Sequence, residues 1–412
     1  MTTPLEAYYG LPSEVKFCKK CVMSNQRPNS RSEFQHNKNS KVAAIHIDAA
    51  GICDACRYHE KKARTIDWVK RREELGHLCD QYRRDDGTYD CVVPGSGGKD
   101  SIMAAHIIKN QFGMHPLTVT WAPHLYTDIG RRNLEHWIDS GFDNILFTPN
   151  GKVHRLLTRL AFKNLLHPFQ PFILGQKNIG AKFAALHNIP LVFYGESEAE
   201  YGNPIATTQT SLREAKYHTG DNYENMALGG ITVRELTEKY AVQMNELKPF
   251  LPMDPDEFDK KKIQVQYLGY YVKWDPQEAY YFAVDHGGFE ANDQRTEGTY
   301  SKYNSLDDKS DPFHYFTTRI KFGIGRATYD ASQEIRNEKI TREEAIALVT
   351  KFDHEFPERY FPEFLDYINM TENEFWQTVD QFRSPHLWKC EDGEWQLRHT
   401  VWQQEMAAIG ST

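Results

Sequence analysis

The six residues Ser96–Ser101 carry the clearest chemical pattern in this chain of 412 residues. They read Ser-Gly-Gly-Lys-Asp-Ser, between the apolar run Tyr89–Gly95 and a helical pattern that begins at Ser101. Glycines allow a backbone to approach an anion closely, and the first free N–H groups of a helix point toward it. Lys99 adds a mobile positive charge. The segment therefore predicts a phosphate-binding turn formed by Ser96, Gly97, Gly98, Lys99, Asp100 and Ser101.

The order of residues in this turn excludes one common phosphate loop and indicates another. A Walker-type loop needs Gly-x-x-x-x-Gly-Lys-Ser/Thr, which the segment lacks. It resembles instead the loop of the PP-loop ATP pyrophosphatases. That resemblance implies cleavage of ATP between its α and β phosphates, transfer of AMP to a substrate oxygen, and displacement of AMP by a nucleophile. The alternative is a glycine turn on the surface of an unrelated α/β domain.

Strand-like and helical patterns alternate between residues 85 and 230 and would position this turn. The strand candidates are short, apolar and bounded by Pro, Gly or Asn: Asp90–Pro94, Leu117–Ala122, Asn144–Thr148 and Pro190–Tyr194. Helical patterns between them include Arg131–Ser140 and Lys152–Leu166. The alternation predicts an α/β fold built on a doubly wound parallel sheet of the PP-loop type, with helices on both faces.

Other strand ends are expected to join the turn, because ligands of such sheets bind at the carboxyl ends of the strands. We therefore expect Trp121 and Gly195 to contact the cofactor. Glu196 follows Gly195 directly, in an acidic segment that also holds Glu198 and Glu200. Mg²⁺ prefers a few carboxylates plus phosphate oxygens, so Glu196 is predicted to act beside the triphosphate. The alternative is a solvated acidic loop, and the roles of Glu198 and Glu200 stay open.

Four of the seven cysteines form two Cys-x-x-Cys pairs, Cys18 with Cys21 and Cys53 with Cys56. Two such knuckles can supply four thiolates tetrahedrally to one Zn²⁺. A zinc ion held in this way has no open position, so we predict a structural site. The alternatives are two disulfides or reduced thiols in the core.

Three regions are expected along the chain. Residues 1–75 would form the zinc module, 76–230 the ATP-binding domain, and 231–412 a mostly helical C-terminal region. Capping boxes at Thr232, Thr341 and Thr371 support the helices of the last region. Within it, Lys321 and Arg326 stand beside glycines, where backbone and cation can approach an anion together. Both are predicted to bind the cofactor, and the alternative is a charged loop between helices.

Composition limits the class of protein. The formal net charge of −8 argues against an extended surface that binds the nucleic-acid backbone, because such surfaces are usually basic. Hydrophobic residues at 40% are enough for a sizeable core. The chain shows no signal-peptide pattern at Met1 and no apolar stretch long enough for a bilayer. The expectation is a cytoplasmic protein without a membrane span.

Taken together, these motifs resemble the N-acetyl sugar amidotransferase family of bacterial surface-polysaccharide and nonulosonic-acid pathways. Beyond the cysteine pairs and the turn, the similarity rests on runs that start at Tyr194, Glu297, Asp307, Lys321 and Ile340. Where the family has Gly-Glu-Asn after the strand, this chain has Ser197 as the third residue. The roles of Asp307, Asp308 and Lys309 stay open.

The resemblance implies an ATP-dependent ligase that acts on a nucleotide-linked N-acetyl sugar, with ATP, Mg²⁺ and a structural Zn²⁺. The acetamido oxygen would be adenylylated, and ammonia would displace AMP to leave an acetamidino group. Lys99, Asp100 and Glu196 would be the catalytic residues. Asp100 would either hold the metal or tie down the turn.

The ammonia source follows from the cysteines. None has the setting of a glutaminase nucleophile, since Thr2 follows Met1 and no cysteine lies on a glycine-flanked elbow. The family resemblance implies separate subunits similar to the glutaminase and cyclase of histidine biosynthesis. Two other functions are the alternatives: a PP-loop enzyme that thiolates tRNA or makes lysidine, and a nucleotide-binding protein without catalysis.

Overall fold

The computed structural model describes residues 5–29, 33–195, 198–202 and 209–409, without the side chains of 406–409. Its centre is a five-stranded parallel sheet in the order β3-β2-β1-β4-β7. The strands are β1 (Cys91–Pro94), β2 (Pro116–Trp121), β3 (Asn144–Phe147), β4 (Leu191–Tyr194) and β7 (Gln264–Tyr267). The order reverses between β1 and β4, where Val92 pairs with both Leu117 and Val192. The predicted α/β class and parallel sheet are confirmed.

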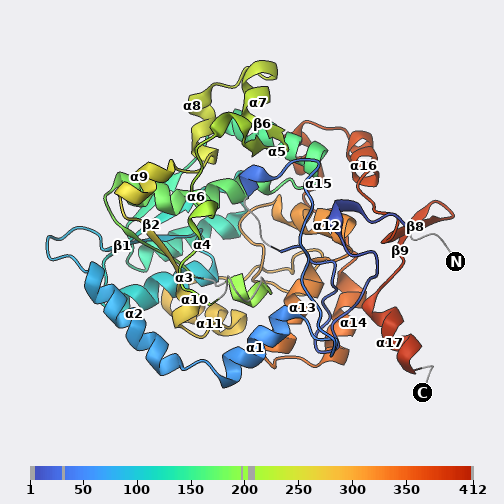
Figure 1. Ribbon diagram of the computed structural model, residues 1–412, viewed down its shortest axis with the longest axis horizontal. Coiled ribbons are helices and arrows are strands. Elements are labelled where there is room, and N and C mark those ends of the chain that lie inside the picture. Colours follow the sequence, from blue (N-terminus) through green and yellow to red (C-terminus); the bar gives the residue numbers. More distant parts are fainter. Residues whose placement is uncertain (1–4, 30–32, 196–197, 203–208, 410–412) are drawn as a thin grey trace.

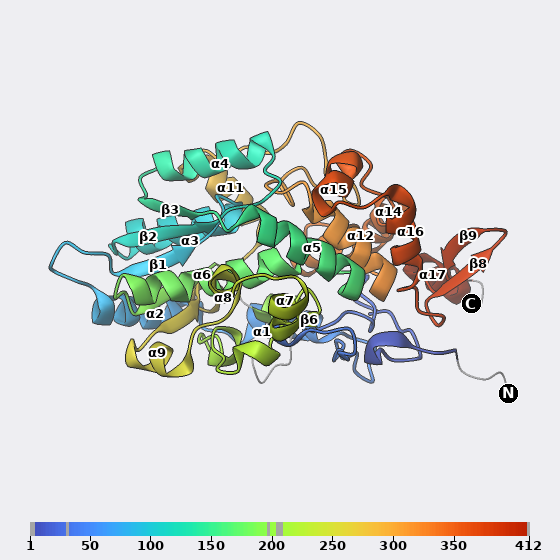
Figure 2. The same cartoon turned by 90° about the horizontal axis from the view of Figure 1, so that it is seen from above.

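Helices cover both faces of this sheet, because alternate residues of its strands are apolar on both sides (Figures 1 and 2). Val92 packs with the helices of one face, and Val93 packs with those of the other. The first face carries α5 (Gly151–Leu165) and α6 (Gln170–Leu186). The second carries α2 (Trp68–Tyr82), α3 (Lys99–His106), α4 (Asp128–Asp139) and α11 (Pro276–Gly287).

The connection from β4 to β7 is long and holds small elements. They are β5 (Ala227–Leu228), β6 (Ile231–Thr232), α7 (Val233–Lys239), α8 (Met244–Leu247) and α9 (Pro255–Lys260). β7 is followed by α10 (Leu268–Tyr271). Sequence patterns did not reveal β7, which pairs with β4 beyond residue 230. The sheet therefore extends past the limit predicted for the ATP-binding domain.

The last third of the chain is mostly helical, as expected. Its helices are α12 (Asp311–Phe322), α13 (Arg326–Arg336), α14 (Arg342–Phe352), α15 (Phe361–Ile368), α16 (Glu372–Asp380) and α17 (Val401–Ile409). Capping boxes are present at Thr232, Thr341 and Thr371. A hairpin of β8 (Trp388–Glu391) and β9 (Glu394–Leu397) stands among these helices.

The N-terminal segment has little regular structure before α1 (Asp54–Arg64). It lies beside α12 and α13 in Figure 1 and shares an apolar cluster with residues of α12 and α15, so the two ends of the chain share a core. The four paired cysteines belong to the same apolar cluster as Phe313 and Phe364. Tyr9 fixes the contact by donating its hydroxyl to the carbonyl of Phe382 at 2.8 Å. None of the described helices has the length and apolar character that a bilayer crossing requires.

Candidate functional site

The turn Ser96–Ser101 links the end of β1 to the start of α3, which is the strand–turn–helix setting expected from the sequence. Gly97 has φ +81°, and a Cβ there would lie 2.7 Å from the carbonyl oxygen of Asn133. A side chain at Gly95 would come within 2.2 Å of the Cβ of Ser101. Both positions therefore require glycine. Gly98 caps α3 without a side chain, which leaves the first N–H groups of the helix for an anion.

Lys99 and Asp100 form the charged part of the turn. The Nζ atom of Lys99 lies 2.5 Å from Oδ2 of Asp100, and the lysine is only 8% exposed. The indole N–H of Trp274 donates to Oδ1 of the same carboxylate at 2.7 Å. Asp100 is therefore held from two sides. This arrangement suits the role of tying down the turn better than an open metal-binding carboxylate.

Two cavities meet at this turn. The sheet-edge cavity, of about 330 Å³, lies between the ends of β1 and β4 and is lined by Ser96, Asp100, Ser101, Gly195, Glu198 and Arg213, among others. The C-terminal cavity, of about 380 Å³, is lined by Ser96–Asp100 and by residues of α12 and α13. Ser96, Gly98 and Asp100 line both cavities, so the turn forms the boundary between them. The sheet-edge cavity lies where the strand order reverses, the usual binding place in such sheets.

The acids after β4 have different surroundings. Glu198 lines the sheet-edge cavity, 3.8 Å from the guanidinium of Arg213. Glu200 is buried in an ion pair with Lys62, at 2.6 Å between Oε1 and Nζ. Lys62 also donates to the carbonyl of Trp274, so Glu200 helps to place that tryptophan. Glu196, the predicted catalytic acid, lies outside the described residues, as does Ser197.

The C-terminal cavity is rich in acids around one arginine. Arg326 pairs with Asp330 at 3.1 Å, and its guanidinium lies 4.2 Å from the ring centre of Tyr315. Burial raises the pKa of Asp311 to about 7, although Arg326 opposes the change. Burial also raises the pKa of Asp307, against a hydrogen bond with Ser96 of the turn. The cavity therefore presents both a cation and proton-binding carboxyls beside the turn.

Not every residue predicted to bind the cofactor lies at these cavities. Arg326 does line the C-terminal cavity, together with the turn. Trp121 is 3% exposed and packs in the core, where a Cβ on Gly175 would come within 2.0 Å of its indole. Lys321 donates to the carbonyl of Leu165 at 2.7 Å and lines another cavity. Neither Trp121 nor Lys321 lines either cavity at the turn.

Sequence patterns also missed residues that the fold brings to the turn. Trp274, Arg213 and Asp311 come from three parts of the chain that are far apart in sequence. No spacing relates them to Lys99. Trp274 precedes α11, which packs on α3. The backbone N–H of Arg213 donates to the carbonyl of Val265 in β7, and Asp311 begins α12. The one local signal is Asp275-Pro276, a helix start directly after Trp274.

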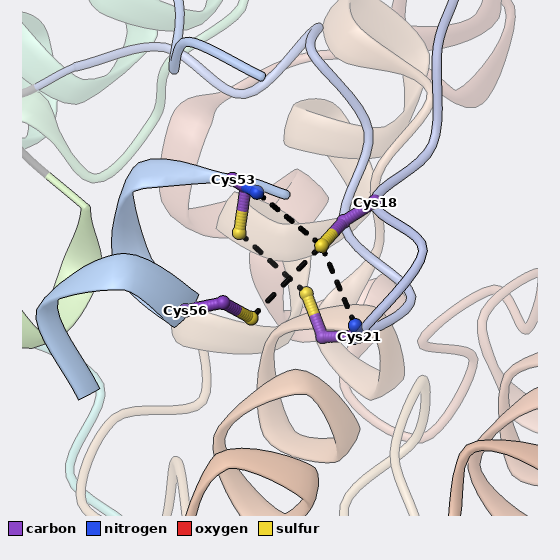
Figure 3. A group of neighbouring side chains, drawn as sticks. All are labelled: Cys18, Cys21, Cys53 and Cys56. Atoms are coloured by element: carbon purple, nitrogen blue, oxygen red, sulfur yellow. Dashed lines mark hydrogen bonds between the residues drawn. The ribbon is translucent and has the colours of Figure 1, made fainter. Parts of the chain in front are cut away.

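The four paired cysteines converge on one point, with their side chains completely buried (Figure 3). The sulfurs of Cys18 and Cys56 are 3.9 Å apart, and those of Cys21 and Cys53 are 3.7 Å apart. A tetrahedron with zinc–sulfur bonds of about 2.3 Å has edges of roughly 3.8 Å. Backbone N–H groups of Lys20, Cys21 and Cys53 point at the sulfur of Cys18, as suits a thiolate. The residues fit a four-cysteine zinc site.

Known proteins resemble parts of this chain. Residues 297–401 match a family described as "LPS biosynthesis protein WbpG-like, C-terminal domain". This stretch contains Asp311, Arg326 and Asp330 of the C-terminal cavity. An uncharacterized protein of Methanocaldococcus jannaschii, MJ1599, is 29% identical over 83 residues, which cover 20% of this chain and 28% of that protein. The family match supports a role in lipopolysaccharide biosynthesis.

Proposed function

We propose that this protein is an ATP-dependent amidotransferase that converts the acetamido group of a nucleotide-linked sugar to an acetamidino group. The observation that carries the proposal is the shared turn. Ser96, Gly98 and Asp100 line both the sheet-edge cavity and the C-terminal cavity, and the far side of the C-terminal cavity belongs to the segment matched to lipopolysaccharide biosynthesis proteins. Two substrates bound in these cavities would meet at the turn.

The sheet-edge cavity is proposed to hold ATP. The first N–H groups of α3 lie at the turn, where phosphates bind in loops of this kind. Lys99 lines the adjoining C-terminal cavity, beside the same turn. Arg213 and Glu198 line the sheet-edge cavity. The carboxylate of Glu198 would hold Mg²⁺ beside the phosphates, together with that of Glu196, which lies outside the described residues. The acetamido oxygen of the sugar would attack the α-phosphorus. Lys99 and the N–H groups would stabilise the charge on the departing pyrophosphate.

The C-terminal cavity is proposed to hold the sugar. Its aromatic and acidic lining, with Tyr303, Tyr315 and Asp330, suits a polyhydroxylated ring, while Arg326 suits a neighbouring anionic group. Ammonia would then add to the imidate carbon that carries the adenylylated oxygen, and the C–O bond would break so that this oxygen leaves with AMP. Each exchange of oxygen for NH consumes one ATP and releases one AMP and one pyrophosphate. Asp311 or Asp307 could accept the proton that the attacking nitrogen loses.

Ammonia is proposed to come from a separate glutaminase. Among the described residues, the one exposed cysteine is Cys390 on the β8–β9 hairpin, away from the residues that line both cavities at the turn. We expect turnover with ammonium salts alone, and turnover with glutamine only after a glutaminase subunit is added. Glutamine hydrolysis by the purified chain would contradict this part of the proposal.

The experiment is a mass-spectrometric screen of nucleotide-activated acetamido sugars with ATP, Mg²⁺ and ammonium. Amidine formation lowers the mass of the sugar nucleotide by about one unit, because NH replaces O. We expect one sugar class to change mass while AMP and pyrophosphate appear in equal amounts. Lys99→Ala serves as the inactive control. ADP formation, or adenylylation of tRNA in place of a sugar, would overturn the proposal.

A further inference from the structure

A second cluster of metal-ligating side chains lies apart from the cysteines. Glu33 begins a short turn of helix, Glu33–Gln35, and His36 follows it. The N–H of His36 donates to the carbonyl of Glu33 at 3.0 Å, which turns both side chains to one side. His167 comes from a different part of the chain, just after α5, where Leu166 adopts a left-handed conformation with φ 44°. The fold thus joins the N-terminal segment to the end of α5.

The donor atoms of these three side chains converge on one point. One donor atom from each lies within 4.8 Å of the others. Oε2 of Glu33 lies 3.5 Å from Nδ1 of His36 and 3.6 Å from Nε2 of His167. These separations allow the carboxylate to pair directly with both imidazoles. They also match the edge of a tetrahedron whose metal–ligand bonds are about 2.0–2.1 Å, which is roughly 3.3–3.4 Å.

We propose that Glu33, His36 and His167 bind a divalent transition-metal ion of the zinc class. Two imidazoles and a carboxylate are a common ligand set for such ions, and three protein ligands leave the fourth position open. All three side chains are at most 13% exposed, so the ion would be shielded from solvent. A cavity of about 180 Å³ borders the cluster and is also lined by Lys177, His314 and Lys321.

The position of the site indicates its effect. Gln170 at the start of α6 donates to the carbonyl of Glu33 at 3.1 Å, so the segment Glu33–Gln35 already contacts α6. A metal ion would hold this segment against α6 more firmly. The ring of His314 stacks on Phe169 at 5.5 Å, and Phe169 lines the C-terminal cavity. The proposed ion therefore lies one layer of side chains behind that cavity, outside the proposed reaction centre.

The first test uses the full, unaltered chain and needs no substitution. Protein loaded with Zn²⁺ and dialysed should retain two zinc ions per chain by elemental analysis. X-ray absorption at the zinc edge should then show sulfur neighbours near about 2.3 Å together with nitrogen or oxygen neighbours near about 2.0–2.1 Å. One zinc ion per chain with sulfur neighbours alone would overturn the proposal.

The second test removes the two imidazoles. The variant His36→Asn/His167→Asn should lose one zinc ion per chain and all nitrogen neighbours, while it keeps the sulfur shell. His187→Asn, at the exposed end of α6, is the matched control and should keep both ions. With Co²⁺, retained sulfur-to-cobalt charge-transfer bands would show that the double variant is folded around its cysteines. A folded double variant that still holds two ions would refute the site.

Discussion

The four-cysteine cluster and the two cavities at the turn Ser96–Ser101 are built in opposite ways. All four cysteines lie within the first 56 residues, and two short spacings place them around one point. The cavities take their lining from segments between Pro94 and Gln333, which only the finished fold brings together. A site made of local spacings is visible in the sequence. A site made between elements is visible there only through its one local part, the turn Ser96–Ser101.

The two regions are nevertheless joined by side chains. α1 begins directly after Cys53 and carries Lys62, which is completely buried and pairs with Glu200 at 2.6 Å. Lys62 also donates to the carbonyl of Trp274, whose indole holds Asp100 in the turn. The cysteine cluster therefore supports the turn through one helix and two side chains.

Loss of a cysteine ligand is expected to have the largest effect. Structural zinc contributes roughly 10–16 kcal/mol in small zinc modules, so Cys53→Ser should release the metal and unfold the N-terminal segment. Elemental analysis and thermal unfolding would measure both losses. Cys390→Ser, on the exposed hairpin, is the matched control and should change neither. A Cys53→Ser protein that retains its zinc and its melting temperature would contradict the assigned ligand set.

Lys99→Ala should leave the fold intact and remove the reaction. A cation that stabilises developing charge contributes about 2.7–4 kcal/mol, so pyrophosphate release should fall roughly 100- to 1000-fold. The control is Lys260→Ala, at the exposed end of α9, which should keep normal turnover. Unchanged turnover in Lys99→Ala would remove the turn from the mechanism.

Trp274→Phe tests the link between the regions. The change deletes the 2.7 Å hydrogen bond to Asp100 but keeps an aromatic ring. A hydrogen bond to a charged group contributes about 1.5–3 kcal/mol, so turnover should fall roughly 10- to 100-fold without loss of zinc. Trp395→Phe, an exposed tryptophan of the hairpin, is the control. Equal activity of the two variants would show that Asp100 does not depend on Trp274.

The smallest expected effect concerns pH and Asp311. Because burial raises the pKa of Asp311 to about 7, the folded protein holds this proton more tightly than the unfolded chain does. That contribution to stability is complete below about pH 4 and is lost as the pH rises toward about 7. Relative to the natural protein, Asp311→Asn should therefore gain stability as the pH rises from about 4 to above about 7, because only the natural side chain becomes a buried anion.

Urea unfolding at pH 4 and pH 8 would measure this difference. The exposed Asp139, changed to Asn, is the control and should give the same small effect at both pH values. An Asp311→Asn protein that gains no stability relative to the natural one between pH 4 and pH 8 would contradict the burial argument.

The fold was more predictable than the site. Four strands could be placed because each is a short apolar run between turn residues, whereas β7, Gln264–Tyr267, alternates polar and apolar residues and was missed. Trp121 was expected at the cofactor because it ends β2. Its indole instead packs over Gly175, since α6 crosses that strand closely. Trp274 and Arg213 could not be predicted, because no local pattern tells which side chain of a distant connection reaches the turn.

In the proposed reaction, the acetamido oxygen of a sugar is adenylylated between the two cavities that meet at the turn Ser96–Ser101. The most direct test uses a sugar nucleotide whose acetamido group carries ¹⁸O, incubated with ATP, Mg²⁺ and ammonium. We expect the label to appear in AMP, in an amount equal to the amidine formed, and to disappear with Lys99→Ala. AMP without ¹⁸O, or product formed with release of ADP, would contradict the claim.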